Sequence, residues 1–275
     1  MNKKILTLIC AGLMVAACVT SCTNKVNKND EKDTETVETA LENPRFSMME
    51  REYPLSLKDK EEDGGKIYVS SNVRKPSVVA FDRVNSGVSK KINTVLKNSY
   101  DRNYESAGEV TDIAVEALKT EGFDISSAGF PWFLTSDYEI VRNDGLVISI
   151  KETIEYYAGG DISPLTSVFY YHFDTKTGEQ IKQVMYNSPD NDDRDRVDNV
   201  VFEKLKEKYG EDAIDYSNVI ASSIVEAGVD GWYFTDNGIV ITFNEGEIAP
   251  IEDGKFEVEL LKSELVDSAN QYFLD

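Results

Sequence analysis

An aromatic hairpin near the C-terminal end of the chain constrains its fold more than any other feature. The two strands would be residues 232–234 (WYF) and 239–243 (IVITF), with Asn237-Gly238 between them. An Asn-Gly pair accepts positive φ at both central positions of a tight turn, so this pattern predicts a β-hairpin. After a loop that contains Pro250, residues 255–260 (KFEVEL) alternate polar and apolar side chains, which predicts a third, half-buried strand.

The middle of the chain repeats this pattern. Residues 133–142 and 146–158 read as strands on either side of Asn143-Asp144-Gly145, which predicts a second hairpin. Residues 167–174 (SVFYYHFD) predict an aromatic strand, and a turn at residues 175–178 follows it. Shorter strands are predicted at residues 53–55, 66–70 and 76–80.

Helices are predicted between these strands. Asp82 is a candidate N-cap for the first of them. Helical spacing of apolar residues predicts helices over residues 84–99, 110–119, 197–209, 218–227 and 263–273. Antiparallel hairpins with helices between them, and no βαβ rhythm, predict an α+β fold with hairpin-rich antiparallel sheets packed against several helices. We expect one unit, or two closely packed subdomains formed by residues 48–190 and 191–275.

The order of these elements resembles an extracytoplasmic domain of bacterial surface proteins. Most of the resemblance is carried by the aromatic hairpin, the Glu247-Ile248-Ala249-Pro250 loop and the strand that runs into Ser263-Glu264-Leu265; the turn at residues 173–178 carries the rest. Similar domains occur in lysozyme-sensing anti-sigma factors (RsiV-like) and in the non-catalytic part of peptidoglycan deacetylases (PdaC-like). The resemblance begins near Tyr53, and it implies a binding domain with lysozyme as a partner.

Two positions depart from the lysozyme-sensing pattern. That family typically continues the proline with an aromatic residue, where this chain has Ile251. The residues Ala158-Gly159-Gly160-Asp161 stand where the family tends to show G-G-A-H. Either departure would alter or abolish affinity for lysozyme while leaving the fold unchanged.

The N-terminus reads as an export signal. Lys3 and Lys4 precede an apolar run over residues 5–17, which is too short to span a bilayer stably. Two small-residue boxes follow and end in Cys18 and Cys22, and either fits the lipobox of a bacterial lipoprotein. The polar sequence after Cys22 favours that cysteine, with Cys18 as the alternative. An ordinary cleaved signal or an uncleaved anchor would be the other interpretations.

The lipoprotein interpretation sets the domain organisation. Residues 1–21 would be the signal peptide, and residues 22–47 are polar, charged and nearly free of large apolar groups, which predicts a flexible tether. The protein would then be anchored by lipid to the cell membrane, facing outside the cytoplasm. All three cysteines lie within residues 1–22, before the expected folded part, so that part has no disulfide and no thiolate nucleophile.

The chain is strongly acidic, with 50 Asp and Glu residues against 29 Lys and Arg residues. Removal of residues 1–21 takes away Lys3 and Lys4 and no acid, so 27 bases and 50 acids leave a formal charge of −23. Nucleic acids and anionic headgroups attract basic surfaces, so this charge argues against both as partners. It favours a cationic protein, whose encounter it would accelerate. The alternative is that acidity only keeps an exported protein dissolved.

The sequence lacks the residues that several catalytic classes require. His172 is the one histidine, whereas zinc sites of the deacetylase or HExxH type need at least two. No G-x-S-x-G motif occurs, so we interpret His172 as a strand residue that is hydrogen-bonded to a neighbour or exposed on the sheet. Residues 190–195 do not fit a calcium loop, because Arg194 takes the fifth ligand position. We expect no enzyme, no metal and no cofactor, although a glycosidase-like carboxylate pair stays open.

The loop between the last two strands is the candidate binding site. Gly246, Pro250 and Gly254 would fix its shape, and Ile251 would be an apolar contact among acids. The candidate binding residues are Glu247, Ile248, Pro250, Ile251, Glu252 and Asp253. An apolar tip with an acidic rim suits a basic protein, and a rigid loop loses less entropy on binding. The alternative is that Ile248 and Pro250 only pack the turn.

These features predict a lipid-anchored, non-enzymatic binding module of the cell envelope. Its ligand would be lysozyme or another cationic protein. The alternative is a protein that binds peptidoglycan or another cell-wall glycan, or a hydrolase that works through carboxylates. In the glycan version, aromatic residues at 169–173 and 232–234 would stack on sugars, although core packing explains them more simply.

Overall fold

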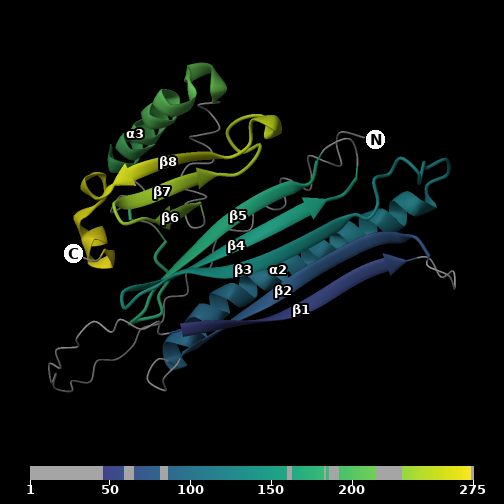
Figure 1. Cartoon of the computed structure of the whole chain (residues 1–275), viewed down its shortest axis with the longest axis horizontal. Helices are drawn as coiled ribbons and strands as arrows, with labels where there is room; N and C mark the ends of the chain where they lie inside the picture. The colour runs from purple at the N-terminus through teal and green to yellow at the C-terminus, as the bar shows by residue number, and fades with distance from the viewer. Residues whose placement is uncertain are drawn as a thin grey trace. The chain divides into compact units, whose positions relative to one another are not determined.

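A five-stranded sheet forms the larger part of the fold in the computed structural model of this chain. Neighbouring strands are antiparallel except for one parallel pair, β2 and β3. The strands follow the order β1-β2-β3-β4-β5 across the sheet (Figure 1), with bounds Phe46–Lys58, Ile67–Ala80, Phe133–Asn143, Val147–Tyr157 and Leu165–Asp174.

The structure describes residues 46–58, 65–80, 86–159, 163–182, 184–185, 192–214 and 231–273. They belong to one compact unit, Asn43–Asp275. The expected signal peptide, both candidate lipidation cysteines, the N-cap Asp82 and the helix expected at 218–227 lie outside the described residues. β1 begins at Phe46, two residues before the expected start of order, and the side chain of Phe46 is buried in the core.

β2, α2 and β3 form a β-α-β unit that the sequence did not predict. The parallel pairing is short: Asn72 faces Thr135 and Val73 faces Ser136, with one further bridge nearby. A parallel pair requires a long crossover, and α2 supplies it. The expected absence of any βαβ rhythm is therefore wrong. The α+β class is confirmed, because the described residues form two mostly antiparallel sheets packed with helices.

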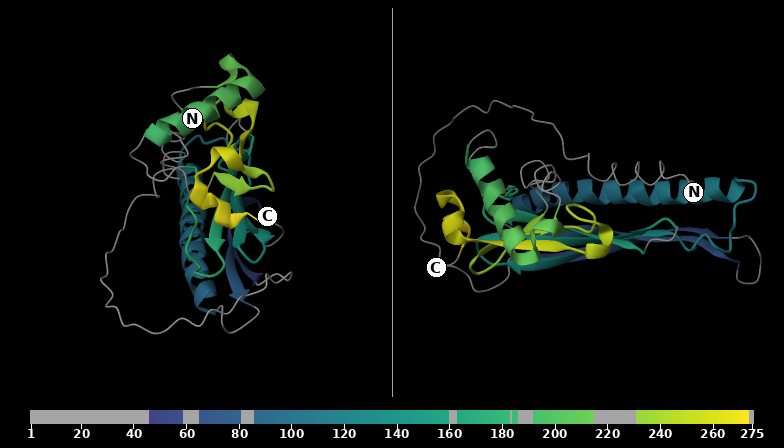
Figure 2. Two further views of the ribbon diagram at one scale, coloured as in Figure 1. Left: turned by 90° about the vertical axis from the view of Figure 1, so that its left-hand side faces the viewer. Right: turned by 90° about the horizontal axis from the view of Figure 1, so that it is seen from above.

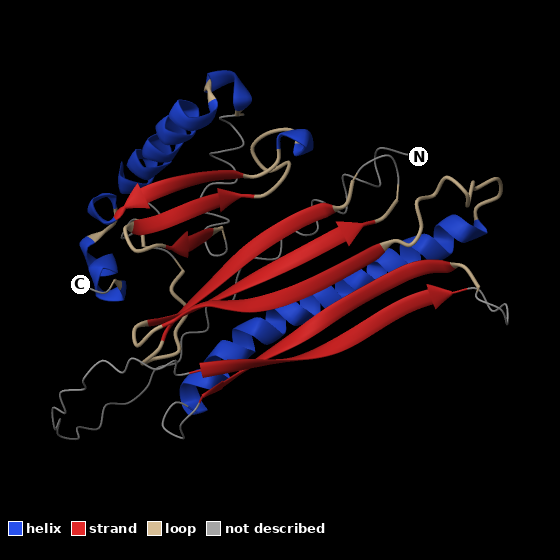
Figure 3. Ribbon diagram, in the orientation of Figure 1, coloured by secondary structure: helices blue, strands red, loops and turns tan. Residues whose placement is uncertain are grey.

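One continuous helix, α2 (Ser86–Lys119), replaces the two helices expected over residues 84–99 and 110–119. The segment between them contains the buried side chains Tyr100, Asn103 and Ala107. Only Tyr100 is a large ring, so a search for apolar periodicity does not connect the two helices. Seen from above, α2 runs along one face of the five-stranded sheet (Figure 2), and Figure 3 shows the helix behind the strands.

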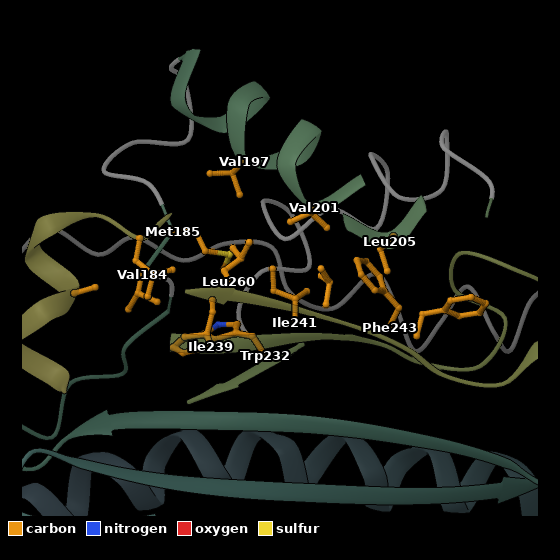
Figure 4. Close-up of a cluster of buried hydrophobic side chains, with 14 of the residues drawn as sticks. Val184, Met185, Val197, Val201, Leu205, Trp232, Ile239, Ile241, Phe243 and Leu260 are labelled. Carbon is orange, nitrogen blue, oxygen red and sulfur yellow. The ribbon is translucent and has the colours of Figure 1, made fainter. Parts of the chain in front are cut away.

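A second, three-stranded sheet contains the predicted aromatic hairpin. Its strands β6 (Trp232–Phe234), β7 (Gly238–Phe243) and β8 (Phe256–Leu261) are antiparallel neighbours, which confirms the predicted strand order. Helix α3 (Asp192–Tyr209) begins five residues before the expected start. Its apolar stripe packs on the sheet (Figure 4) through the buried side chains Val197, Val201 and Leu205, which join Trp232, Ile239, Ile241, Phe243 and Leu260.

The turn of this hairpin differs from the expected Asn237-Gly238 turn. The backbone N–H of Thr235 donates to the carbonyl of Gly238, so Asp236 and Asn237 are the central residues. Gly238 is already the first residue of β7 and does not have positive φ. A Cβ there would collide with the carbonyl oxygen of Leu260, so close approach of β8 is what requires glycine.

The C-terminal segment forms two short 3₁₀ helices, Lys262–Glu264 and Asp267–Tyr272, where one α-helix was expected over residues 263–273. Leu265 and Val266 between them are extended, and the N–H of Val266 donates to the carbonyl of Val184. This tertiary bond and the burial of Ala269 in the core replace the α-helical pattern. Among the described helices, none has both the length and the apolar character needed to cross a membrane.

Candidate functional site

Loop 245–254 connects β7 to β8 and is built from two consecutive turns. The N–H of Glu247 donates to the carbonyl of Asn244 at 3.1 Å and closes the first turn. The second is the 3₁₀ helix Ile251–Asp253, in which the N–H of Asp253 donates to the carbonyl of Pro250 at 3.0 Å. Gly254 ends that helix with φ 79°, a conformation that favours glycine. The loop therefore has a defined backbone conformation.

The structure separates the six predicted binding residues into two groups. Pro250, Ile251, Glu252 and Asp253 are exposed at the tip of the loop. Ile248 is 0% exposed and belongs to the core cluster beneath α3, so its assignment as a contact residue is wrong and the packing alternative holds for it. Glu247 is half-buried, and its Oε2 accepts a hydrogen bond from the backbone N–H of Asn244 at the start of the loop.

Ile251 is held in place although it is 41% exposed. Gly246 has φ 77°, and a Cβ added there would lie 2.8 Å from Cγ1 of Ile251. The side chain of Ile251 therefore lies directly over Gly246. With Glu252 and Asp253 beside it, the tip presents one fixed apolar group next to two exposed acids.

Burial raises the pKa of Glu247 to about 7. A backbone hydrogen bond opposes this effect: the N–H of Asn244 donates to Oε2 of Glu247 at 2.6 Å and favours the charged form. The carboxyl therefore titrates near neutrality, well above its ordinary range. The sequence placed Glu247 in the acidic rim, and the structure places it at the base of the loop.

Asn244 anchors the loop to the five-stranded sheet. Its Oδ1 accepts a hydrogen bond from the N–H of Val168 on β5 at 2.8 Å, and its Nδ2 donates to the carbonyl of the same residue at 3.3 Å. One side chain thus pairs with both polar groups of an edge-strand residue, as a neighbouring strand would. Sequence analysis missed Asn244, because a single polar residue after a strand carries no local sign of a partner 76 residues away.

His172 forms a second link between the two sheets. Its Nε2 lies 2.8 Å from the carbonyl oxygen of Trp232, and its Nδ1 lies 2.7 Å from the hydroxyl of Ser149. The pKa of His172 is lowered to about 4, chiefly by burial; the bond to Trp232 raises it, and the charge of Arg142 adds a smaller lowering effect. The structure confirms the interpretation of His172 as a strand residue bonded to a neighbour.

A buried carboxyl group lies under α2, and no sequence pattern predicted it. Glu152 on β4 is 1% exposed. The hydroxyl of Ser99 lies 2.7 Å from both of its oxygens, Nδ2 of Asn103 donates to Oε1 at 2.5 Å, and the hydroxyl of Tyr171 donates to Oε2 at 2.7 Å. Burial and the nearby Glu152 raise the pKa of Tyr138 far above its ordinary value. This closed network positions α2 on the sheet.

Two further predicted features are partly described. Gly159 has φ 80°, and a Cβ added there would collide with Nε1 of Trp132, so no larger residue fits. Gly160 and Asp161 lie outside the described residues. Residues 190 and 191, part of the segment 190–195 that was compared with a calcium loop, also lie outside the described residues. Within the described part of the chain, no group of three or more His, Cys, Asp or Glu side chains could hold a metal ion.

Comparison with known proteins finds one family that the chain resembles in part. Residues 179–263, which include α3, the three-stranded sheet and loop 245–254, match the family described as "Protein of unknown function (DUF3298)". The C-terminal part of the chain is therefore similar to DUF3298 domains. No curated protein matches this chain.

A solved structure of a DUF3298 family member is similar to this chain in fold. A family member from Bacteroides fragilis has a TM-score of 0.56 at 10% identity, covering 83% of this chain and 96% of its own. A DUF3298 family protein from Pseudomonas aeruginosa has a TM-score of 0.46 at 12% identity, covering 84% and 97%. The first similarity supports the fold assignment beyond the matched residues.

Proposed function

We propose that this protein is a non-enzymatic binding module of the bacterial cell envelope, with a cationic protein such as lysozyme as its ligand. The observation that carries the proposal is the exposed tip of loop 245–254. There Ile251 is fixed over Gly246 beside Glu252 and Asp253. A preordered apolar group with an acidic rim loses little conformational entropy when it meets a basic surface.

The charge of the whole chain supports the same class of ligand. A formal charge of −21 attracts a basic protein over long range and accelerates its encounter with the loop. The resemblance to RsiV-like and PdaC-like domains suggests lysozyme as the first ligand to test. An aromatic residue after Pro250 is the usual pattern of the lysozyme-sensing family, so Ile251 would make a smaller apolar contact.

We also propose that lipid on Cys22, or alternatively on Cys18, holds the domain at the outer side of the cell membrane. The polar residues after Cys22 would then act as a tether. The chain would present its loop to proteins that enter the envelope from outside.

Glycan binding is the alternative, and Trp232 and His172 do not support it. Their rings lie 4.1 Å apart and both side chains are buried, Trp232 at 1% exposure and His172 at 0%, so they pack in the core. Tyr170 and Tyr233, whose rings lie 5.0 Å apart, are partly exposed, so this pair stays open for contact with a sugar.

Calorimetric titration with hen lysozyme tests the proposal. The chain without its expected signal peptide should bind one-to-one at low and at physiological salt. Ile251→Ser should weaken binding at least tenfold, whereas Leu261→Ser, which removes another exposed aliphatic side chain of the same sheet, should leave it unchanged. Loss of binding at physiological salt, or an equal affinity for the wild type and for Ile251→Ser, would contradict a specific site at the loop tip.

A further inference from the structure

We propose that Tyr170 and Tyr233, with the carboxylates of Glu139, Glu257 and Glu259 around them, form a contact surface for an arginine side chain of a cationic partner. The identity of that partner as a cationic protein rests on the proposed function. The preference of the surface for arginine is a property of this chain and can be measured with a peptide.

Tyr170 lies on the face of the five-stranded sheet that is opposite α2. The hydroxyl of its neighbour Tyr171 donates to Glu152 beneath α2 at 2.7 Å, and successive side chains of a strand point to opposite faces. Across the strands, Tyr170 is paired with Lys151 of β4, and Lys151 is paired with Glu139 of β3. These three side chains therefore form one row on the face that α2 leaves uncovered.

Tyr233 lies on the face of the three-stranded sheet that is opposite α3. It is paired with Val240 of β7, which stands between Ile239 and Ile241, two residues of the core cluster beneath α3. Val240 is paired in turn with Glu259 of β8. Tyr233, Val240 and Glu259 therefore form a second row, on the face away from α3.

The two rows meet at the tyrosine pair. The ring centroids of Tyr170 and Tyr233 lie 5.0 Å apart with their planes inclined by 39°, and both side chains are partly exposed. Because each ring packs on the other, the pair loses little rotamer freedom when a ligand arrives. Val168, two residues before Tyr170 on β5, is bonded to Asn244. The pair therefore lies next to the strand position at which loop 245–254 is anchored.

The charge around the tyrosine pair favours a cationic ligand. Burial contributes most to raising the pKa of Tyr170 to about 12, and Tyr233, Glu257 and Glu139 add to the effect. Burial and the charges of Glu257 and Glu259 raise the pKa of Tyr233. None of the groups that act on these two pKa values is basic. Both hydroxyls therefore lie in a negative electrostatic field.

Three lysines near this surface are already bound. Nζ of Lys151 lies 3.8 Å from Oε2 of Glu139. On α3, the ammonium groups of Lys204 and Lys208 each donate to a backbone carbonyl of β8 at 3.0 Å. With these three cations engaged, the two carboxylates on β8 remain available to a ligand.

Arginine combines the two properties that this surface can recognise. Its planar guanidinium group stacks on aromatic rings, and its N–H donors pair with carboxylates. A lysine ammonium group is a compact, strongly hydrated charge and gains less from the rings. A neutral sugar could stack on the tyrosines but would gain nothing from the surrounding charge. We therefore expect selectivity for arginine over both.

Peptide titration followed by NMR tests the surface in the full-length chain. A short arginine peptide should bind at least about threefold more tightly than a lysine peptide of the same length and charge. Tyr233→Leu should abolish this preference. Tyr104→Leu, which removes an exposed tyrosine of α2, should retain it. Glu257→Gln should weaken the binding of both peptides and keep the preference.

Equal affinity of the wild type for the two peptides, or a preference that persists in Tyr233→Leu, would overturn the proposal. The wild type decides should that variant fold poorly. On addition of the arginine peptide, the ring signals of Tyr170 and Tyr233 should shift more than those of Tyr104, and the reverse would overturn the proposal. Saturable binding of an N-acetylglucosamine oligomer at the same rings, tighter than that of the arginine peptide, would assign the surface to a glycan instead.

Lysozyme titration separates this surface from the proposed function. Tyr233→Leu should weaken lysozyme binding at least about threefold. A preference for arginine without any lysozyme binding would contradict lysozyme as the ligand and leave the surface in place. Undiminished lysozyme binding by Tyr233→Leu, together with equal affinity for the two peptides, would overturn the surface and leave the loop site.

Discussion

Nε2 of His172 on β5 donates a 2.8 Å hydrogen bond to the carbonyl oxygen of Trp232 on β6. Because a carbonyl only accepts, this contact assigns the ring proton to Nε2, and Nδ1 then accepts from the hydroxyl of Ser149. The two sheets are thus joined through an imidazole that is fully buried and uncharged at neutral pH.

Stability should therefore decrease on mild acidification. The pKa of His172 is about 4 in the folded state against 6.5 when exposed, so the unfolded chain takes up the proton first as the pH falls. The contribution of His172 is complete above pH 6.5 and is lost as the pH falls to 4, an effect of about 3 kcal/mol. Urea denaturation of the wild type and of His172→Gln at several pH values measures it.

The difference between the two curves isolates the histidine, because every carboxyl group is common to both proteins. Above pH 6.5 the difference should be constant and should reflect the altered bond to Trp232. A difference that does not shrink between pH 6.5 and 4 would show that the imidazole is not the group responsible.

Sequence analysis predicted the strands and helices that are specified by residues close together in the chain. Alternation and turn residues identified β3, β4 and β7, and apolar spacing identified α3. The middle of α2 was missed in part because the buried side chain of Asn103 looks like an exposed one until Glu152 is placed opposite it. Asn103 donates its hydrogen bond to this residue, which lies about 50 positions away in the sequence.

At the candidate site, too, sequence analysis found what local residues specify and missed what long-range contacts specify. The loop and its exposed tip followed from Pro250 and the surrounding glycines, which act locally. The inward positions of Glu247 and Ile248 depended on α3 and on the contact with β5, which no local pattern specifies. Likewise, the parallel pairing of β2 and β3 rests on two ladder positions and leaves almost no sequence signal.

Removal of the buried carboxyl group should destabilise the protein strongly. Glu152→Ala would leave Ser99, Asn103 and Tyr171 without their shared acceptor in the core. Unsatisfied buried polar groups cost about 1–3 kcal/mol each, so the free energy of unfolding should fall by more than ~3 kcal/mol. Glu155→Ala, three residues along the same strand and exposed, should stay within about 0.5 kcal/mol. If urea denaturation gave the same loss of stability for Glu152→Ala and Glu155→Ala, the buried network would make no specific contribution to the free energy of unfolding.

The contact between Asn244 and Val168 should hold the edge of β5. Asn244→Ala removes both hydrogen bonds to Val168 and should cost about 1–3 kcal/mol of stability. Exchange of the Val168 amide should also accelerate, which distinguishes loss of this contact from a global effect. Asn98→Ala, at an exposed position of α2, is the matched control and should leave exchange at Val168 unchanged. Unaltered exchange at Val168 in the Asn244 variant would argue against the anchor.

Two glycine-to-alanine substitutions should have opposite effects. In Gly238→Ala the new methyl group collides with the carbonyl oxygen of Leu260, so β7 and β8 must separate, and we expect a loss of more than ~2 kcal/mol. Gly108 lies within α2 with no neighbouring atom within 4 Å of an added Cβ. Alanine is the better helix former, so Gly108→Ala should stabilise the protein by about 0.5–1 kcal/mol. Thermal unfolding of both variants checks this pair. An unchanged melting temperature for Gly238→Ala would show that the backbone of β8 leaves room for a methyl group at this position of β7.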